Sequence, residues 1–310
     1  MYLEIIRHDG PGRLGKFDFN GGKFDTPSIL WSQPAGGKPK GYLEITPIEE
    51  TKEGCLAEYG TLFKENEIEA HGFLPSFPSG YNSPEKIAKE AVIKTLDLAK
   101  NYPEQGAVLE GGKYIELREM GADTLGNNPI IKIANSEELS KNHRKLVNTV
   151  TYLREKALPT TAIYMSGIHP SLFPLLVYMG VDFFDLKRGI LDSHKKIYHT
   201  KYGGLSLQKF NELPCQCKNC QNADPKNMSQ EALLSHNVGV WLASIIEVRE
   251  SIRRGELRNL VEERAANNVV AMGALRILDA EKSDFLEKHT PIFNTYDRVG
   301  DIKSKTRFIE

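Results

Sequence analysis

The chain has 310 residues, and its 40 Lys and Arg residues nearly balance its 41 Asp and Glu residues, which leaves a net charge of −1. This balance excludes a basic nucleic-acid coat protein and an acidic tail protein, although basic patches can still exist locally. The length exceeds that of an ordinary single domain but suits one barrel with an appendage.

The N-terminus and the cysteines indicate where the protein works. Residues 1–10 lack the long apolar core of a signal peptide, and no apolar run in the sequence is long enough to span a bilayer. Cys55 stands apart from the other cysteines, so a reducing compartment fits better than a disulfide framework. We therefore expect a cytoplasmic protein that makes no contact with a membrane.

The first fifty residues alternate between apolar and polar side chains and are punctuated by glycine. Residues 3–7 and 14–19 read as two strands joined by a turn at residues 9–12, and residues 24–30 read as a third strand. Antiparallel hairpins at the start of the chain indicate a β cap, which we place at residues 1–50.

From about residue 68 the sequence alternates between short apolar strands and amphipathic helices. The strands are expected near residues 71–75, 106–109, 129–133, 161–165 and 181–185, and the helices are expected to begin at the caps Ser83 and Ser136, near Glu116 and after His169. Such alternation is typical of parallel βαβ units, and at this length the economical closure is a (β/α)8 TIM-like barrel over residues 51–205. An open doubly wound sheet is the alternative, but no phosphate-binding glycine fingerprint follows a first strand.

A cysteine cluster opens the last third of the chain. Cys215, Cys217 and Cys220 fall within six residues, and His236 follows at the head of the next helical segment. Three thiolates and one imidazole make a closed tetrahedral zinc site of the structural kind. The alternative is a set of unpaired loop cysteines, because the wide gap to His236 is not by itself diagnostic.

A long amphipathic helix follows the cysteines. Trp241, Ile245 and Ile252 share its apolar side, and Gly255 is expected to end it. Further helices are expected at residues 257–265 and 269–278. We assign residues 206–278 to a zinc-binding subdomain with its following helices and residues 279–310 to a C-terminal tail, all within one catalytic domain covering residues 1–310.

In a barrel, side chains at the C-terminal ends of the strands line the active site. That rule gives seven candidates, which are Asp185, Glu110, Gly111, Gly112, Ser166, Gly167 and His71. Asp185 follows a strongly apolar strand and can act as a nucleophile or base, or it can cap a helix. The Gly111-Gly112 pair would let a flat ring approach the backbone closely, or it forms an ordinary tight turn.

The histidines outside the cluster are less specific. His169 precedes a proline, which favours a loop or capping residue over a catalyst. His194 and His199 lie in the basic stretch 187–201, which could meet phosphates or form a solvated loop.

Together these motifs resemble the tRNA-guanine transglycosylase superfamily. The Cys-x-Cys-x-x-Cys motif with its later His-Asn is similar to the family's zinc subdomain, residues 108–118 to its Val-Gln-Gly-Gly-x-Tyr and Leu-Arg stretch, and residues 179–185 to its Gly-x-Asp-x-Phe-Asp strand. Thr26-Pro27 and the helix at residues 246–255 also match. The resemblance implies a tRNA substrate, a structural zinc ion, a homodimer formed through the zinc region, and Asp185 as the nucleophile that attacks the ribose.

The sequence departs from that family at acidic positions. Residues 69–73 lack the second catalytic aspartate, residues 76–83 lack the base-recognising aspartate, and Glu110 stands where the family has glutamine. The opening, residues 7–15, looks most like archaeosine synthase, an archaeal paralogue of the transglycosylases. That resemblance implies addition of lysine to the nitrile of 7-cyano-7-deazaguanine in the tRNA D-loop, with Asp185 and Glu110 as the candidate carboxylates.

Longer relatives carry a C-terminal tRNA-binding PUA domain that is not expected in these 310 residues. We therefore expect a short form, or one subunit of a split enzyme whose partner supplies a PUA domain or the radical lyase activity that cleaves the lysine adduct. Two alternatives stay open: a transglycosylase that exchanges guanine for 7-cyano-7-deazaguanine, and a non-catalytic zinc-containing subunit of a tRNA-modifying complex.

Overall fold

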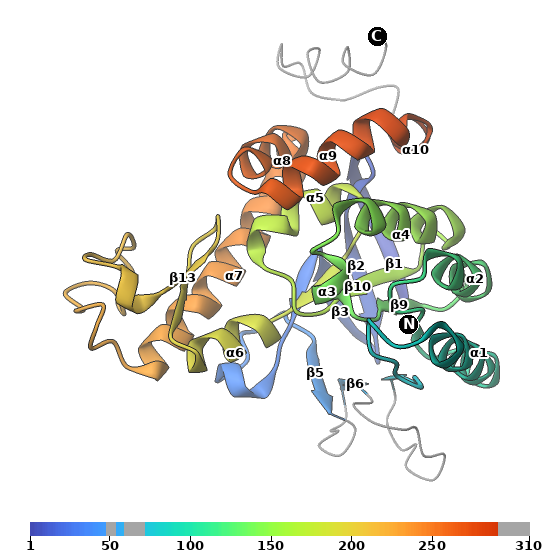
Figure 1. Ribbon diagram of the computed structural model, residues 1–310, viewed down its shortest axis with the longest axis horizontal. Helices are drawn as coiled ribbons and strands as arrows, with labels where there is room; N and C mark the ends of the chain where they lie inside the picture. Colours follow the sequence, from blue (N-terminus) through green and yellow to red (C-terminus); the bar gives the residue numbers. More distant parts are fainter. Residues whose placement is uncertain (48–53, 59–71, 291–310) are drawn as a thin grey trace.

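The computed structural model describes residues 1–47, 54–58 and 72–290 (Figure 1). It begins with an antiparallel sheet in the order β1-β2-β3, formed by Tyr2–Asp9, Gly12–Phe19 and Gly22–Thr26. The expected single strand over residues 24–30 is divided, because β4, Ser28–Leu30, leaves the antiparallel sheet and pairs in parallel with β11. The antiparallel cap therefore ends at Thr26.

Two sheets of parallel strands form the centre of the molecule. The first has the order β4-β11-β10-β9-β8, and the second has the order β5-β6-β7. Their remaining strands are β5 (Glu44–Pro47), β6 (Cys55–Glu58), β7 (Phe73–Leu74), β8 (Ala107–Leu109), β9 (Ile130–Ile133), β10 (Ala162–Met165) and β11 (Phe183–Asp185). The structure therefore confirms a mixed α/β fold with parallel strands.

Backbone hydrogen bonds connect these two sheets at both of their edges. At one edge the Trp31 amide donates to the Leu43 carbonyl at 2.7 Å, and the Ile45 amide donates to the Trp31 carbonyl at 2.9 Å. At the other edge the Gly106 amide donates to the Phe73 carbonyl at 3.1 Å. Each sheet therefore continues into the other through short irregular links.

Helices surround the strands, with α1, α2 and α4 on one side and α8 to α10 together at one end (Figure 1). The helices are α1 (Glu85–Asn101), α2 (Ile115–Leu125), α3 (Ser136–Leu139), α4 (His143–Lys156), α5 (Phe173–Tyr178), α6 (Lys187–His194), α7 (Gln230–Arg254), α8 (Leu257–Ala266), α9 (Val269–Glu281) and α10 (Ser283–His289). Within the described ranges, no helix combines the length and the apolar character that crossing a bilayer requires.

Side chains of successive strand residues enter two different hydrophobic clusters. Ile131 and Ile163 pack in the large cluster beneath the helices, whereas Ile130 and Tyr164 pack in a second cluster on the other face of the strands. Phe17 of the antiparallel sheet also belongs to this second cluster and meets Phe183 edge to face at 5.3 Å. The antiparallel cap therefore covers the inner face of the parallel strands.

Two of the predicted helix caps are wrong. The residue before α1 is Pro84, and the hydroxyl of Ser83 does not cap the helix. Asn135, in a left-handed conformation, precedes α3, while the Ser136 hydroxyl turns back to the Ile133 carbonyl at 2.5 Å. The predicted end of α7 is confirmed, because Gly255 has φ +70° and its amide caps the last turn.

Candidate active site and metal centre

The cysteine loop and α7 bring four possible metal ligands together. The ligand atoms of Cys215, Cys217, Cys220 and His236 all lie within 4.8 Å of one another. The Cys217 and Cys220 sulfurs are 3.5 Å apart, and His236 Nδ1 lies 3.3 Å from Cys220 Sγ and 3.6 Å from Cys217 Sγ. Tetrahedral zinc geometry requires sulfur–sulfur and sulfur–nitrogen separations of about 3.8 Å and about 3.6 Å. These residues therefore fit a closed four-ligand site.

The other nitrogen of His236 fixes the orientation of its ring. Nε2 lies 2.8 Å from the carbonyl oxygen of His199, and a carbonyl can only accept, so Nε2 must carry the proton. Nδ1 then presents its lone pair to the sulfurs, as metal-bound histidines usually do. His236 lies within α7 and not at its head, so that part of the sequence prediction is wrong.

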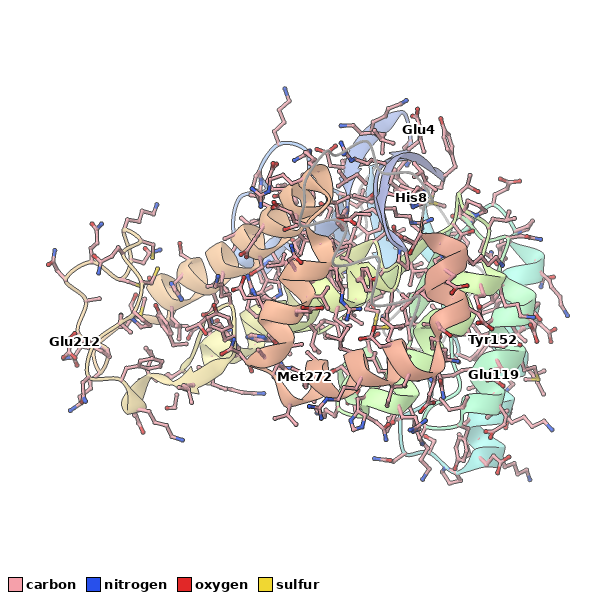
Figure 2. All side chains as sticks on the ribbon, turned by 90° about the horizontal axis from the view of Figure 1, so that it is seen from above. Glu4, His8, Glu119, Tyr152, Glu212 and Met272 are labelled. Carbon is pink, nitrogen blue, oxygen red and sulfur yellow. The ribbon has the colours of Figure 1, made fainter. Side chains whose placement is uncertain are left out.

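The metal-ligand cluster belongs to a lobe that projects from the body of the molecule. The lobe contains β12 (Ile197–His199), β13 (Gly204–Ser206), the cysteine loop and the first turns of α7. Figure 1 shows it beside α6 and α7, and Figure 2 shows Glu212 at its far end. Tyr198 stacks on His236 with ring centroids 4.0 Å apart, and its hydroxyl lies 3.5 Å from Cys220 Sγ. The lobe thus surrounds the cluster with its own small apolar core.

Asp185 ends β11 and is almost fully buried. One carboxylate oxygen accepts hydrogen bonds from the Tyr164 hydroxyl at 2.7 Å and the Ser166 hydroxyl at 2.5 Å. The other accepts from the backbone amides of Gly167 at 2.9 Å and Lys187 at 3.2 Å. The structure therefore brings the predicted Ser166 and Gly167 to Asp185, and it also supports the alternative that Asp185 binds the first turn of α6.

Glu110 follows β8 and is 3% exposed. The Ser76 hydroxyl donates to one of its oxygens at 2.7 Å, and the Ser79 hydroxyl donates to the other at 3.3 Å. Burial raises the pKa of the Glu110 carboxyl, and the bonds from Ser76 and Ser79 oppose that rise. Both serines lie in the segment 76–83, where the base-recognising aspartate was expected but is absent. Glu110 can therefore carry a proton near neutral pH more readily than an exposed glutamate.

Two cavities lie side by side at this end of the strands, and both are lined by Glu58 and Lys187. The first, of about 300 Å³, is lined by Glu110, Lys132 and Ser166, among others. The second, of about 410 Å³, is lined by Asp185 and by apolar side chains of β5 and α6. The two candidate carboxylates therefore line two cavities that share Glu58, and Glu58 forms an ion pair with Lys132.

Gly111 and Gly112 line neither of these two cavities. Both have positive φ angles, +133° and +54°, and a Cβ at Gly112 would meet the Tyr81 carbonyl oxygen at 2.9 Å. Arg118, fully buried, donates to the carbonyls of Gly112 at 2.9 Å and Ala134 at 3.0 Å, which ties the loops after β8 and β9 together. The structure thus supports the tight-turn alternative, and contact with a flat ring stays a prediction. His71 lies outside the described residues.

A buried histidine pair connects the metal lobe to the body. His169 Nε2 lies 3.0 Å from His199 Nδ1, and His199 Nε2 lies 3.0 Å from the Asp192 carboxylate. His169 also caps the short helix at Pro170–Leu172, as the sequence indicated. Burial, followed by the neighbouring His199, holds the pKa of His169 well below its usual value. His199 is therefore part of a buried network and not of a solvated basic loop.

The sequence analysis missed several residues around the two carboxylates. Ser76 and Ser79 donate to Glu110, Tyr164 donates to Asp185, and Lys132 forms an ion pair with Glu58 in the wall of the first cavity. One signal was present in the sequence, because Lys132 interrupts an otherwise apolar strand. A buried strand carries a charge only when that charge has a partner or a function.

Comparison with known proteins identifies the family. Residues 76–269, more than half of the chain, match the model of the TGT family, described as queuine tRNA-ribosyltransferase. The chain belongs to the tRNA-guanine transglycosylase family. We call the cavity-lined end of the parallel strands, with Glu58, Glu110, Lys132 and Asp185, the mouth. The family match includes every described candidate residue of the mouth except Glu58. It also includes all four possible metal ligands.

Individual relatives of this transglycosylase-family chain come from archaea. It is 27% identical over 363 residues to a tRNA-guanine(15) transglycosylase of Methanococcus maripaludis, covering 94% of this chain and 56% of the relative. It is 27% identical over 355 residues to the protein of the same name from Thermococcus onnurineus, covering 94% of this chain and 61% of that relative. The chain thus spans less than two thirds of these relatives.

Proposed function

We propose that this chain is a tRNA-modifying enzyme of archaeosine biosynthesis that adds lysine to the nitrile of 7-cyano-7-deazaguanine in the tRNA D-loop. Family membership supports action on a guanine-derived base of tRNA. The observation that carries the choice of reaction is the environment of Asp185, whose two oxygens already accept four hydrogen bonds. Such bonds occupy the lone pairs of the carboxylate and reduce its reactivity as a nucleophile, which fits a charge held in place better than an attacking group.

Addition to a nitrile needs an amine, a proton acceptor and a proton donor. The neutral ε-amine of the substrate lysine attacks the nitrile carbon, so that a nitrogen–carbon bond forms and one carbon–nitrogen π bond breaks. One proton leaves the attacking nitrogen, and one reaches the nitrile nitrogen, which gives an amidine. We assign Asp185 to binding a cationic group of the substrate. We assign Glu110, whose pKa is raised by burial, to accepting a proton and then returning it.

We propose that the metal is zinc, held by Cys215, Cys217, Cys220 and His236 in a structural role. A closed set of three thiolates and one imidazole leaves no open position for a substrate. When bound, the ion would supply a cross-link between the cysteine loop and α7. The separations among the sulfurs and Nδ1, together with the fixed tautomer of His236, support this assignment.

We infer that the parallel strands close into a (β/α)8-type barrel. The bonds at Trp31 and at Gly106 support closure, because they connect the two parallel sheets at both edges. The inner hydrophobic cluster also supports it, since each of the eight parallel strands in the described part of the chain contributes a buried residue to it. The active site would then lie at the C-terminal ends of the strands, where Asp185 and Glu110 are found.

The proposal includes partners as well as a substrate. The substrate is tRNA, which family membership supports, and the partner is a second polypeptide that supplies tRNA binding through a PUA domain or the radical lyase that acts on the lysine adduct. A homodimer formed through the metal lobe and a cytoplasmic location stay predictions.

The test is mass spectrometry of nucleosides from tRNA that carries 7-cyano-7-deazaguanine, after incubation with isotopically labelled lysine. We expect a labelled adduct with the native chain, alone or with its partner, and at least about 100-fold less with Asp185→Ala, because loss of one preorganised electrostatic contact costs about 100- to 1,000-fold. Asp284→Ala, on α10, is the matched control and should leave the yield unchanged. Absence of the adduct under all of these conditions would reject the proposal.

Guanine exchange is the second candidate, because both named relatives are tRNA-guanine(15) transglycosylases. In that case Asp185 would be the nucleophile at the ribose, and Glu110 would be the second carboxylate. The discriminating measurement is exchange of radiolabelled guanine into unmodified tRNA, which lysine transfer does not require. If the native chain exchanges guanine and Asp185→Ala abolishes this exchange, guanine exchange is favoured over lysine addition.

A further inference from the structure

Lys132 is a charged residue in a strand that is otherwise apolar. Its neighbours Ile131 and Ile133 pack beneath the helices, so the alternation of β9 directs Lys132 to the inner face of the strands. There its side chain is 16% exposed, and its amine pairs with the carboxylate of Glu58 at the end of β6. Desolvation makes such an amine costly, so its presence calls for a partner or a function.

The position of Lys132 connects it to both candidate carboxylates. It lines the same cavity as Glu110, and its amine lies 5.9 Å from the centre of the Tyr164 ring. The hydroxyl of Tyr164 in turn donates to Asp185. Burial, and then the charge of Lys187, lower the pKa of Lys132 to about 8, while Asp185 opposes this shift. An amine with these properties can lose and regain a proton close to neutral pH.

The ion pair with Glu58 alone does not explain these features. Glu58 lines both cavities, so the pair lies on a cavity wall that a substrate would touch and not within the hydrophobic core. A purely structural link between β6 and β9 would not need to face the cavity that contains Glu110. A substrate that enters this cavity meets the amine of Lys132 directly.

We propose that Lys132 is the proton donor to the nitrile nitrogen of the substrate, and that Glu58 is its partner when no substrate is bound. This inference rests on the proposed lysine addition and assigns the donor which that reaction requires. As the substrate amine bonds to the nitrile carbon, the π electrons move to the nitrile nitrogen, which takes a proton from Lys132. The attacking nitrogen then loses its own proton, which returns through the carboxylates to Lys132, so that no co-reactant is consumed.

Lys187 is the competing donor, because it lines both cavities and is exposed. Its backbone amide contacts Asp185, but no hydrogen bond or ion pair of its side chain to a cavity residue is found in the described part of the chain. Comparison of Lys132→Met with Lys187→Met therefore separates the two lysines. Lys94, on the exposed side of α1 in an ion pair with Glu90, provides a surface control.

The first experiment measures the infrared stretching band of the nitrile of 7-cyano-7-deazaguanine in tRNA that is bound to the full chain without lysine. A donor on the nitrile nitrogen shifts this band, so we expect a shifted band in the native protein, in Lys187→Met and in Lys94→Met. We expect the unshifted band in Lys132→Met and in the double variant Lys132→Met/Glu58→Gln, which leaves no unpaired buried carboxylate. An unaltered shift in Lys132→Met, or its loss in Lys187→Met, would overturn the proposal.

The second experiment measures adduct formation against pH. We expect Lys132→Met to lower the rate at least about 100-fold with little change in binding of the cyano base, as for loss of a general acid. The native rate should fall above pH of about 8, and in Lys132→Arg this alkaline limb should move to higher pH. Retention of the native alkaline limb in Lys132→Arg would contradict the assignment.

The two proposals fail in different ways. If the native chain binds the cyano base with a shifted nitrile band but forms no lysine adduct, then lysine addition fails and the contact with Lys132 stands. If the adduct forms but Lys132→Met retains the shift and the rate, then only the role of Lys132 fails. If tRNA that carries the cyano base does not bind to the native chain, alone or with its partner, both proposals are rejected.

Discussion

The metal lobe and the mouth of the parallel strands are built in opposite ways. In the lobe, three of the four ligands come from one short loop, Cys215, Cys217 and Cys220. At the mouth, Glu58, Glu110, Lys132 and Asp185 come from the ends or interiors of four different strands. The possible metal ligands of the lobe therefore come mostly from local sequence, whereas the residues of the mouth are brought together by the packing of the whole fold.

The two regions also differ in how much apolar packing supports them. The lobe has a small cluster centred on Tyr198, Leu207 and Leu233, with the cysteines at its edge. The mouth is supported by the two large clusters on either face of the parallel strands. A small domain with a small hydrophobic core needs an additional cross-link such as a bound metal ion, whereas a large domain does not. Loss of the metal should therefore affect the lobe and spare the mouth.

The largest expected effect is that of Cys220→Ser. Serine is a poor zinc ligand, so we expect loss of stoichiometric zinc. Because binding of a structural zinc ion can contribute up to about 10 kcal/mol to folding, we also expect the lobe to unfold. Metal content by mass spectrometry and amide exchange of residues 197–236 measure these effects. Cys55→Ala, in β6, is the matched control and should retain the zinc. Full metal content in Cys220→Ser would show that the lobe does not depend on this ligand.

The next effect is that of Arg118→Met at the mouth. The guanidinium donates to the carbonyls of Gly112, Leu109 and Ala134, and methionine would remove the Arg118 donor from the Gly112 and Ala134 carbonyls, while the Leu109 carbonyl would still accept from the Ala134 amide. At about 1–3 kcal/mol for each buried unsatisfied group, we expect a loss of at least about 2 kcal/mol in unfolding free energy. Denaturant titration measures it. Zinc content should stay the same, and a loss of zinc would show that mouth and lobe are not independent.

Sequence reasoning succeeded where the chemistry is local. The cluster of three cysteines, the end of α7 at Gly255 and the capping role of His169 all follow from residues close together in the chain. The five parallel strands from β7 to β11 were also predicted, because their short apolar runs differ from the helices around them, whereas β4, β5 and β6 were not recognised as parallel strands. In the successful cases the information lies within short stretches of sequence, except for His236, which is sixteen residues from the last cysteine.

Sequence reasoning failed where contacts join distant segments. The Tyr164 donor to Asp185 lies in β10, and the donors to Glu110 come from a segment about thirty residues earlier, so periodicity could not identify these contacts. The division of residues 24–30 into β3 and β4 was missed because both halves have strand character, and only their different partners separate them. The caps of α1 and α3 failed because tertiary contacts outweigh the local preference for serine.

A smaller effect is expected for Tyr164→Phe, which removes one of the four donors to Asp185. Hydrogen bonds to charged groups contribute about 1.5–3 kcal/mol, so we expect a loss within that range in stability. The remaining donors, Ser166, Gly167 and Lys187, should keep the carboxylate in place. Calorimetric unfolding measures the change. An effect as large as that of Arg118→Met would mean that Tyr164 alone orients Asp185.

The smallest effect is the pH dependence that Glu110 gives to the mouth. Burial raises the pKa of Glu110 in the folded state, so between the unfolded and folded pKa values the folded chain binds more protons than the unfolded chain. Stability should therefore fall as pH rises through this window, by at most about 1.4 kcal/mol per pH unit for one proton.

Glu110→Gln removes this titration while keeping an oxygen that can accept from Ser76. We expect the slope of stability against pH to flatten above pH of about 4.5, as measured by denaturant titration across that range.

Glu104→Gln, in the surface loop before β8, is the matched control and should keep the native slope. The cysteine cluster is unchanged in both variants. A difference in zinc content between them would therefore show that the mouth and the metal lobe affect each other. An unchanged slope in Glu110→Gln would show that the hydrogen bonds from Ser76 and Ser79 compensate fully for the burial of this carboxyl.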